Sequence, residues 1–264
     1  MLQQFELFNG SLEEISSSKK LITTLNAHSF NTLKKDTAFR EALQASDMIL
    51  PDGISIVLAA RLLYGKKIKK IAGADLFRYE MQRVHAYRGK CFFLGSSETT
   101  LNLIRERVNK EYPGLQVYSY SPPYKQQFTE EESRTMINEV NSVEPDVLFV
   151  GMTAPKQEKW ASLHSQQLRA SHICCIGAVF DFYAGTVQRA PVWMINAGME
   201  WFYRFVREPK RMWRRYLIGN TLFVSEILRE KFQNPIRNIR FTALQSQTVK
   251  TKTALNRRRK NIFY

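Results

Sequence analysis

Asp52 stands between a proline and a glycine in the segment MILPDGISIVLAARLLYGKK. The residues before it are apolar and strand-like, and those after it are apolar and helix-like. A carboxylate at the end of a buried strand can act as a general base that removes a proton from an acceptor hydroxyl. The alternative is an ordinary turn, because Asp-Gly fits turns in which the side chain bonds to nearby backbone. The local sequence alone favours the turn.

Two further segments carry polar residues beside a glycine or a helix start. In IAGADLFRYEM, we expect Gly73 and Asp75 at a substrate-binding site, where Gly73 could allow close approach of a ligand to the backbone and Asp75 could cap the following helix. The alternative is that Asp75 only caps the helix. The lysines just upstream, which include Lys70, could contact phosphate or form a solvated face. In GMTAPKQEKW, Gln157 and Glu158 fall in the first turn of a helix, where they could face a ligand or only favour the helix start.

Two common nucleotide-binding motifs do not occur in the chain. GMTAPKQEKW lacks the G-x-x-x-x-G-K-[ST] pattern of a P-loop, and IGAVFDFYAG lacks the G-x-G-x-x-G pattern of dinucleotide-binding proteins. The second segment nevertheless places Asp181 after a predicted strand, where an acidic side chain could bond to a ribose or a base.

Arginines recur at three- and four-residue spacing near the C-terminus. Arg204, Arg207 and Arg211 should therefore lie broadly on one helical face. Tryptophan, phenylalanine and tyrosine accompany them, a composition typical of helices at a membrane interface. Two alternatives stay open: a helix packed on its own core with arginines that reach solvent, and a helix that binds a nucleic-acid duplex. No helix-turn-helix or zinc-finger signature supports the second alternative.

The sequence does not predict a metal site. No aspartates form a D-x-D pair, and the 4 histidines show neither H-E-x-x-H nor Cys/His ligand spacing. Cationic side chains, rather than a divalent ion, should therefore stabilise any diphosphate bound here. We expect no metal and no other cofactor.

The positive charge of the chain is concentrated at its C-terminal end. The 264 residues carry a formal net charge of +15. Residues 201–264 contain 16 of the 39 Lys and Arg but only 3 of the 24 Asp and Glu, a net charge of +13. Such a segment favours a polyanion, whether nucleic acid, an anionic membrane surface or substrate phosphates.

Cysteine usage argues for a reducing compartment. Cys174 and Cys175 are neighbours on a predicted strand and should point to opposite faces of the sheet, which argues against a disulfide framework. The chain has no run of about 18 uncharged apolar residues. Its N-terminal MLQQFELFNGSLEE lacks the features of a signal peptide. We therefore expect a cytoplasmic protein, soluble or peripheral to the membrane.

Apolar, β-branched runs alternate along the chain with segments of helical periodicity. Strands are predicted at residues 21–26, 48–51, 90–94, 115–120, 146–151 and 172–177. Helices are predicted near residues 28–45, 53–64, 74–88, 97–111, 130–143 and 155–170. Helical connections of this length imply an α/β fold, a Rossmann-like parallel sheet with helices on both faces. In such a sheet ligands bind beyond the carboxyl ends of the strands, where Asp52 falls.

From about residue 193 the pattern is helical only. A helix at 194–208 should end before Pro209, and a second at 210–232 should follow. We therefore expect an α/β catalytic core at 1–192, a basic helical appendage at 193–234 that associates with a membrane, and a basic, mobile tail at 235–264. An uncovered appendage of this kind could also join copies of the chain as a homo-oligomer in solution.

Seven segments, taken together, resemble one family. In order along roughly residues 20–220 they are TTLNAHS, ILPDGISIV, KIAGADLF, FFLGSSE, GMTAPKQEKW, IGAVFDFYAGTVQRAP and GMEWFYRFVREPKRMWRRY. This ordered set resembles the WecG/TagA/CpsF glycosyltransferases, also called glycosyltransferase family 26. Each segment alone is weak evidence, whereas the ordered set is highly specific.

The resemblance implies an inverting hexosyltransferase that moves a sugar from a UDP-sugar to a sugar linked to polyprenyl diphosphate. It implies work at the cytoplasmic face of the membrane, in the synthesis of teichoic acid, common antigen, capsule or exopolysaccharide. The transferred sugar would be an N-acetylmannosamine, its uronic acid or glucose. Asp52 occupies the position of the family's proposed catalytic base, in the P-D-G motif.

The resemblance also implies substrate-binding positions, in the T-x-N and P-x-Q-E motifs and in the segment associated with nucleotide-sugar binding. These positions are Thr24, Asn26, Gln157, Glu158, Asp181 and Arg189. The three C-terminal arginines named above would reach the diphosphate. Lys70 stands where the family usually has arginine, and lysine loses the bidentate fork. Cys175 stands where glycine is common, which would alter the approach of the nucleotide to the backbone.

Two other classes of function stay open. One is a nucleic-acid-binding protein that uses the segment of charge +13, and the other is a polysaccharide-assembly scaffold without turnover. Neither predicts the ordered set of motifs. The glycosyltransferase is therefore the main prediction, with no nucleic-acid partner expected.

Overall fold

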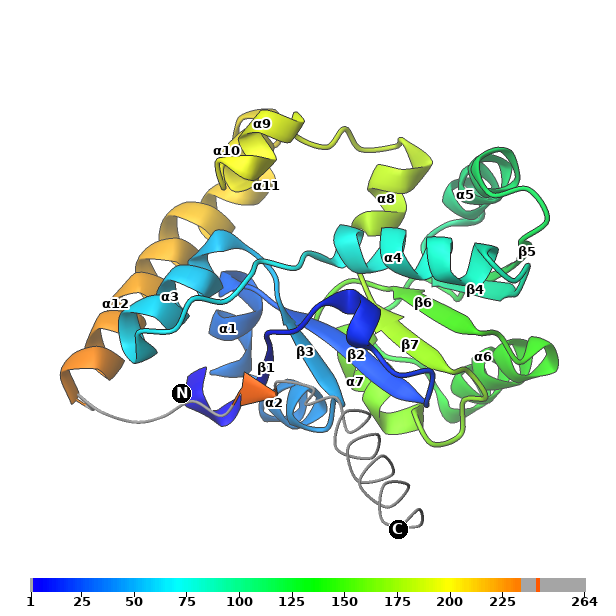
Figure 1. The fold of residues 1–264 in the computed structure, drawn as a ribbon, viewed down its shortest axis with the longest axis horizontal. Coiled ribbons are helices and arrows are strands. Elements are labelled where there is room, and N and C mark those ends of the chain that lie inside the picture. The colour runs from blue at the N-terminus through cyan, green and yellow to red at the C-terminus, as the bar shows by residue number, and fades with distance from the viewer. Residues whose placement is uncertain (1, 234–240, 243–264) are drawn as a thin grey trace, which may run out of the picture.

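The computed structural model describes residues 2–233 and 241–242, and its centre is a parallel β-sheet (Figure 1). The eight strands within these residues lie in the order β5–β4–β6–β7–β2–β3–β1–β8. They are β1 Leu7–Phe8, β2 Lys20–Leu25, β3 Met48–Pro51, β4 Lys90–Gly95, β5 Gln116–Tyr120, β6 Val147–Gly151, β7 His172–Cys175 and β8 Phe241–Thr242. Strands such as MILP and HICC are buried along their whole length because the sheet is covered on both faces.

Helices pack on both faces of the sheet, which confirms the predicted α/β architecture. They are α1 Ala27–Leu33, α2 Thr37–Gln44, α3 Ile54–Tyr64, α4 Gly73–His85, α5 Glu98–Glu111, α6 Glu130–Val143, α7 Lys156–His164 and α8 Val179–Ala184. Helices α4, α5 and α8 share one hydrophobic core with Cys174, whereas α6 and α7 share another with Cys175. The two neighbouring thiols therefore point to opposite faces, as predicted, and both are free.

Some predicted boundaries were wrong. The helix expected at 28–45 is two helices, because the Asp36 side chain accepts a hydrogen bond from the Phe39 amide at 2.9 Å and caps a new start. The helix expected at 155–170 ends at His164. The strand expected at 172–177 ends at Cys175, and α8, which was not predicted, follows Gly177 at a φ of +54°.

The C-terminal region is helical, as predicted, but in more pieces. It contains α9 Val192–Asn196, α10 Glu200–Arg207, α11 Pro209–Trp213, the π-helical turn η3 Arg214–Ile218 and α12 Gly219–Gln233. The helix expected at 194–208 is interrupted at Gly198, whose φ of +73° is not helical. It ends before Pro209, as predicted.

Helix α12 packs on the core rather than standing apart from it (Figure 1). Phe223 and Ile227 are buried with residues of α1, α2 and α3, and the Phe223 ring meets Phe30 edge-on at 5.2 Å between centroids. The buried Glu230 accepts hydrogen bonds from the Leu2 amide at 3.3 Å and from the Tyr64 hydroxyl at 3.1 Å. The expected appendage thus shares a hydrophobic core with the first 192 residues.

No helix within the described residues is both long enough and apolar enough to cross a membrane. The tail predicted to be mobile, 235–264, lies outside the described residues apart from β8, which pairs with β1.

Candidate active site

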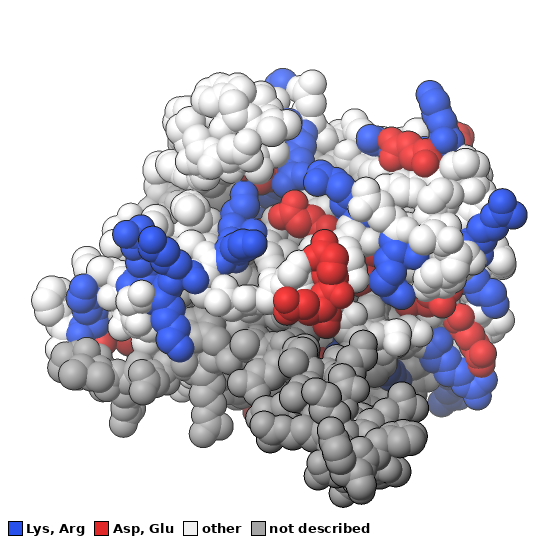
Figure 2. All heavy atoms as spheres, in the orientation of Figure 1, with Lys and Arg blue, Asp and Glu red and all other residues white. Residues whose placement is uncertain are grey.

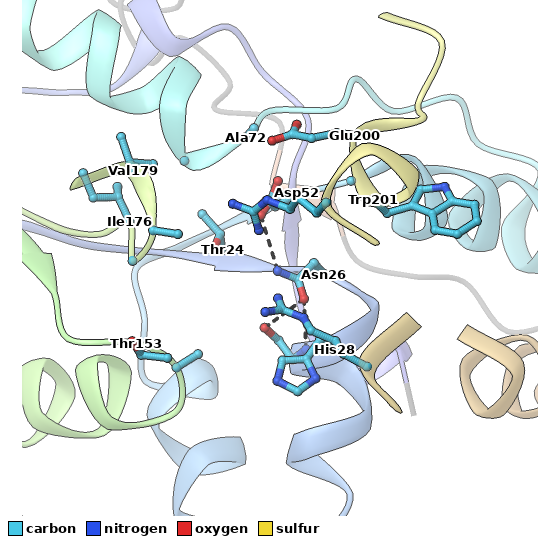
Figure 3. Close-up of a pocket in the computed structure, with 18 of the residues that line it drawn as sticks. Thr24, Asn26, His28, Asp52, Ala72, Thr153, Ile176, Val179, Glu200 and Trp201 are labelled. Atoms are coloured by element: carbon cyan, nitrogen blue, oxygen red, sulfur yellow. Dashed lines mark hydrogen bonds between the residues drawn. The ribbon is translucent and has the colours of Figure 1, made fainter. Parts of the chain in front are cut away.

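A cavity of about 1100 Å³ opens where the strands of the sheet end (Figure 3). Its walls come from the loops after β2, β3, β6 and β7 and from the C-terminal helices α10 and α12. The cavity therefore lies at the carboxyl edge of the sheet, where a parallel α/β fold normally binds its ligands.

Asp52 lies on the wall of this cavity, beside Asn26 (Figure 3). Strands β2 and β3 pair with Leu25 opposite Pro51, and the Asp52 amide donates to the Leu25 carbonyl at 2.9 Å. This register brings the residues after the two strands together, and Asn26 Nδ2 donates to Asp52 Oδ2 at 3.4 Å. Gly53 then turns the chain at a φ of +103°. The turn and the proposed base are thus one feature, because the turn presents the carboxylate to the cavity.

The surroundings of Asp52 act on its pKa in opposite directions. Burial raises the pKa of this carboxyl above its usual value, and the negative charge of Glu200 also raises it. The hydrogen bond from Asn26 and the positive charges of Arg204 and Lys70 lower it. Because burial dominates, Asp52 binds a proton more strongly than an exposed aspartate does, as a general base requires.

Three arginines from the C-terminal helices line the cavity: Arg204, Arg211 and Arg215. The Arg204 guanidinium lies 4.5 Å from the centre of the Phe182 ring. Burial lowers the pKa of Arg215, while the negative charge of Asp52 acts against this shift. An arginine keeps its charge in a protein, so the cavity holds a cluster of fixed cations.

Arg207 was predicted to lie beside Arg204 and Arg211, but it does not line the cavity. Its guanidinium donates to Gln188 Oε1 and, at 3.2 Å, to the Tyr203 hydroxyl. The prediction assumed one continuous helical face. Within the same helix α10, Arg207 contacts Gln188 and Tyr203, whereas Arg204 lies over Phe182 and lines the cavity.

Asp181 and Arg189, assigned to nucleotide-sugar binding, both line the cavity. Burial raises the pKa of Asp181, and the positive charges of Arg211 and Arg204 lower it. Arg189 forms an ion pair with Glu200, with 3.5 Å between Nε and Oε1.

Gln157 and Glu158 are buried but still line the cavity. Gln157 Nε2 donates to Glu158 Oε1 at 2.8 Å, whereas Gln157 Oε1 and Glu158 Oε2 have no hydrogen-bond partner among the described residues. Burial raises the pKa of Glu158 to about 7. Buried polar atoms normally have partners, so these two oxygens are suited to bind donors of a ligand. Cys175 lies behind them in the core, where its Sγ donates to the Gln157 carbonyl at 3.8 Å.

Thr24, Lys70 and Gly73 also line the cavity, whereas Asp75 does not. Lys70 Nζ donates to the Ile195 carbonyl at 3.4 Å. At Gly73 an added Cβ would lie 3.4 Å from the Ile176 carbonyl oxygen, an ordinary van der Waals contact, so packing within the protein does not by itself require glycine there. Asp75 Oδ2 accepts from the Ala72 amide at 2.9 Å, so the alternative role, capping α4, is the one the structure shows.

The cavity residues that were not singled out from the sequence include His28, Glu200 and Arg215. Burial, with the nearby charge of Arg215, lowers the pKa of His28 to about 4, so this imidazole is neutral at neutral pH. Glu200 stands four residues before Arg204, a spacing that places both on one face of α10. That spacing could have indicated it, whereas Arg215 depends on the π-helical turn that contains it.

Within the described residues, no group of three or more His, Cys, Asp or Glu side chains could hold a metal ion.

Comparison with known proteins identifies the family. The model described as "Glycosyl transferase WecG/TagA/CpsF family" matches residues 3–237. The chain belongs to this family. A protein of Bacillus subtilis (strain 168) named N-acetylglucosaminyldiphosphoundecaprenol N-acetyl-beta-D-mannosaminyltransferase is 31% identical over 198 residues, 75% of each chain. A protein of the same name from Staphylococcus aureus (strain MW2) is 26% identical over 231 residues, 88% of each chain.

Membership of the WecG/TagA/CpsF family makes this protein a glycosyltransferase, which confirms the main prediction from the sequence. The ordered motifs that carried the resemblance lie within the matched residues, and most of them contribute to the cavity. The alternative of a nucleic-acid-binding protein gains no support from these relatives.

Proposed function

We propose that this enzyme moves a hexose from a UDP-sugar to a sugar linked to polyprenyl diphosphate, with inversion at the anomeric carbon. The observation that carries the proposal is the meeting of the half-buried carboxylate of Asp52 with the cationic side chains of Arg204, Arg211 and Arg215 in a single cavity. A base and a set of fixed cations are what a displacement with a diphosphate leaving group requires.

In the proposed reaction, Asp52 takes the proton of the acceptor hydroxyl. The hydroxyl oxygen forms a bond to the anomeric carbon from the side opposite UDP. The bond from that carbon to the UDP oxygen breaks, and its electron pair goes to the diphosphate. The raised pKa of Asp52 favours the proton transfer, and the arginines stabilise the charge that grows on the leaving group.

We propose that these arginines serve in place of a divalent cation, so that transfer needs no metal or other cofactor. The test is the rate of transfer before and after treatment with EDTA. An unchanged rate is expected, and a loss that Mg²⁺ or Mn²⁺ restores would contradict the proposal.

We propose that the enzyme works as a peripheral protein on an anionic membrane surface, on the cytoplasmic side. Large apolar side chains are exposed along α9, α10 and α11: Trp193, Phe202, Val206 and Trp213. Figure 2 shows this part of the surface mostly free of charged residues, with Lys and Arg gathered nearby. Apolar side chains flanked by basic ones suit an interface of lipid and water.

The relatives' names point to a first choice of substrates. Both name N-acetylglucosaminyldiphosphoundecaprenol and an N-acetylmannosaminyl group, so we propose UDP-N-acetylmannosamine as the donor to test first, with a place in cell-wall polysaccharide synthesis. UDP-glucose and the UDP-linked uronic acid of N-acetylmannosamine are the other donors that we expected from the sequence.

The test is sugar transfer to undecaprenyl-diphosphate-linked N-acetylglucosamine in anionic vesicles, from each UDP-sugar in turn. We expect transfer from one donor, reduced by about 10²-fold or more in Asp52→Asn. The Kd of that donor, measured separately, should stay unchanged in the variant, which would separate catalysis from binding. An enzyme that neither transfers sugar nor binds any UDP-sugar would overturn the proposal.

A further inference from the structure

The cavity at Asp52 continues into an apolar groove between α3 and α12, which lie side by side in Figure 1. Positions four residues apart share a face of a helix, so each helix contributes a continuous wall. The walls are Ile54, Leu58 and Leu62 of α3 and Asn220, Val224 and Leu228 of α12. The floor of the groove is Ala59, Phe223 and Ile227.

Apart from Asn220, the walls are aliphatic and yet exposed or partly exposed. Leu58 is 54% exposed and Val224 is 53% exposed, whereas the floor residues are buried. The floor closes the groove because Phe223 and Ile227 belong to the hydrophobic core that joins α12 to α3. Single exposed leucines are common on protein surfaces, whereas a contiguous apolar surface of this kind indicates a binding site.

The charged residues that line the cavity do not come from the groove helices α3 and α12. Lys70 and the three arginines line the cavity near Asp52, whereas every residue that α3 and α12 contribute to the lining is uncharged. A ligand that matches both the cavity and the groove has an anionic head and a hydrocarbon tail. We propose that this groove binds the first isoprene units of the acceptor's prenyl chain. The inference rests on the proposed function, in which the acceptor is a polyprenyl diphosphate.

The position of the groove fits such a chain. Its α3 wall begins at Ile54, directly after the turn that presents Asp52 to the cavity. From Ile54 to Leu62 the helix rises about 12 Å, at 1.5 Å per residue. The start of the prenyl chain is therefore held beside the candidate base, while the rest of the chain stays in the bilayer. Contact with the chain would fix where the diphosphate and the acceptor sugar lie.

Binding of prenyl diphosphates tests the groove without sugar transfer. Titration calorimetry with geranyl, farnesyl and geranylgeranyl diphosphate should give a Kd that falls with chain length, by about tenfold or more over the series. In Leu58→Gln the Kd values for the three ligands should become nearly equal. Leu222→Gln is the matched control, because Leu222 is 53% exposed on α12 but does not line the groove, and it should bind like the parent. Equal Kd values in the parent, or the same loss in both variants, would overturn the inference.

Transfer assays separate this inference from the proposed function. Acceptors with undecaprenyl and geranyl chains would be compared in detergent micelles, with the parent and Leu58→Gln. We expect the parent to prefer the long chain through a lower KM, and Leu58→Gln to lose most of that preference. Binding that depends on chain length, without any transfer, would support the prenyl-binding groove and contradict the proposed function. Transfer to both acceptors with equal KM in the parent would support the proposed function and contradict binding of the prenyl chain in the groove.

Discussion

Asn26 donates from Nδ2 to Asp52 Oδ2 at 3.4 Å, while its own Oδ1 accepts from the Ser29 amide at 3.0 Å and caps α1. One side chain therefore starts a helix and orients the candidate base. The arrangement depends on the parallel pairing of β2 with β3, which ends both strands at the same level of the sheet.

The two roles of Asn26 can be separated by substitution. Asn26→Asp keeps an equally good helix cap, whereas Asn26→Ala should lower the free energy of unfolding by about 1 kcal/mol. Asn26→Asp removes the donor to Asp52 and adds a negative charge beside it, and both changes raise the pKa of Asp52. The base then loses its proton only at higher pH, so the acid limb of the kcat/KM profile should move to higher pH. A profile in Asn26→Asp identical to the parent's would contradict this role.

Arg215 and Arg214 are neighbours in the chain but differ in their surroundings. Arg215 lines the cavity, whereas Arg214 is exposed and lies 5.1 Å from the centre of the Trp213 ring. Arg215→Gln should lower kcat/KM by about 10²-fold, because it removes a cation from the developing diphosphate charge. Arg214→Gln should stay close to the parent in assays with a soluble acceptor. Equal losses in the two variants would indicate that net charge, rather than position, is what matters.

Glu158 should make stability depend on pH. Its pKa in the folded protein is about 7, above the ordinary value of 4.5, so the folded state holds the proton more tightly than the unfolded state. The stabilisation is complete at pH values below 4.5 and is lost as pH rises through about 7, by at most about 3 kcal/mol. Glu158→Gln cannot ionise and should lack this loss. Urea denaturation at pH 5 and pH 8 measures the change in the free energy of unfolding. An equal change in parent and variant would contradict the role of Glu158 in this pH dependence.

Exposed apolar side chains on α10 should hold the protein on lipid. Phe202 is 45% exposed, and Phe202→Glu should reduce binding to anionic vesicles in a sedimentation assay without lowering the thermal midpoint. Leu163→Glu, at a position 74% exposed on α7, is the control and should bind like the parent. Binding that depends equally on both positions would argue against a lipid-facing surface on α10.

The order of strands and helices follows from the sequence because it depends on local properties. Apolar runs, helical periodicity and the proline at 209 act over a few residues, and they predicted the parallel sheet and the end of α10. The position of Asp52 at a strand end followed for the same reason. The ordered motifs identified the family, whose model matches residues 3–237.

Which residues line the cavity depended on tertiary structure. Arg207 bonds to Gln188 and Tyr203, whereas Arg215, in the π-helical turn, lines the cavity, and spacing on one ideal helix does not anticipate either position. Asp75 turns to its own backbone, while Gln157 and Glu158 face the cavity, although the sequence offered each the same two roles. Helix α12 meets α3 through contacts between residues more than 150 positions apart. Local sequence determined which residues could do chemistry, and strand register and helix packing determined which of them meet.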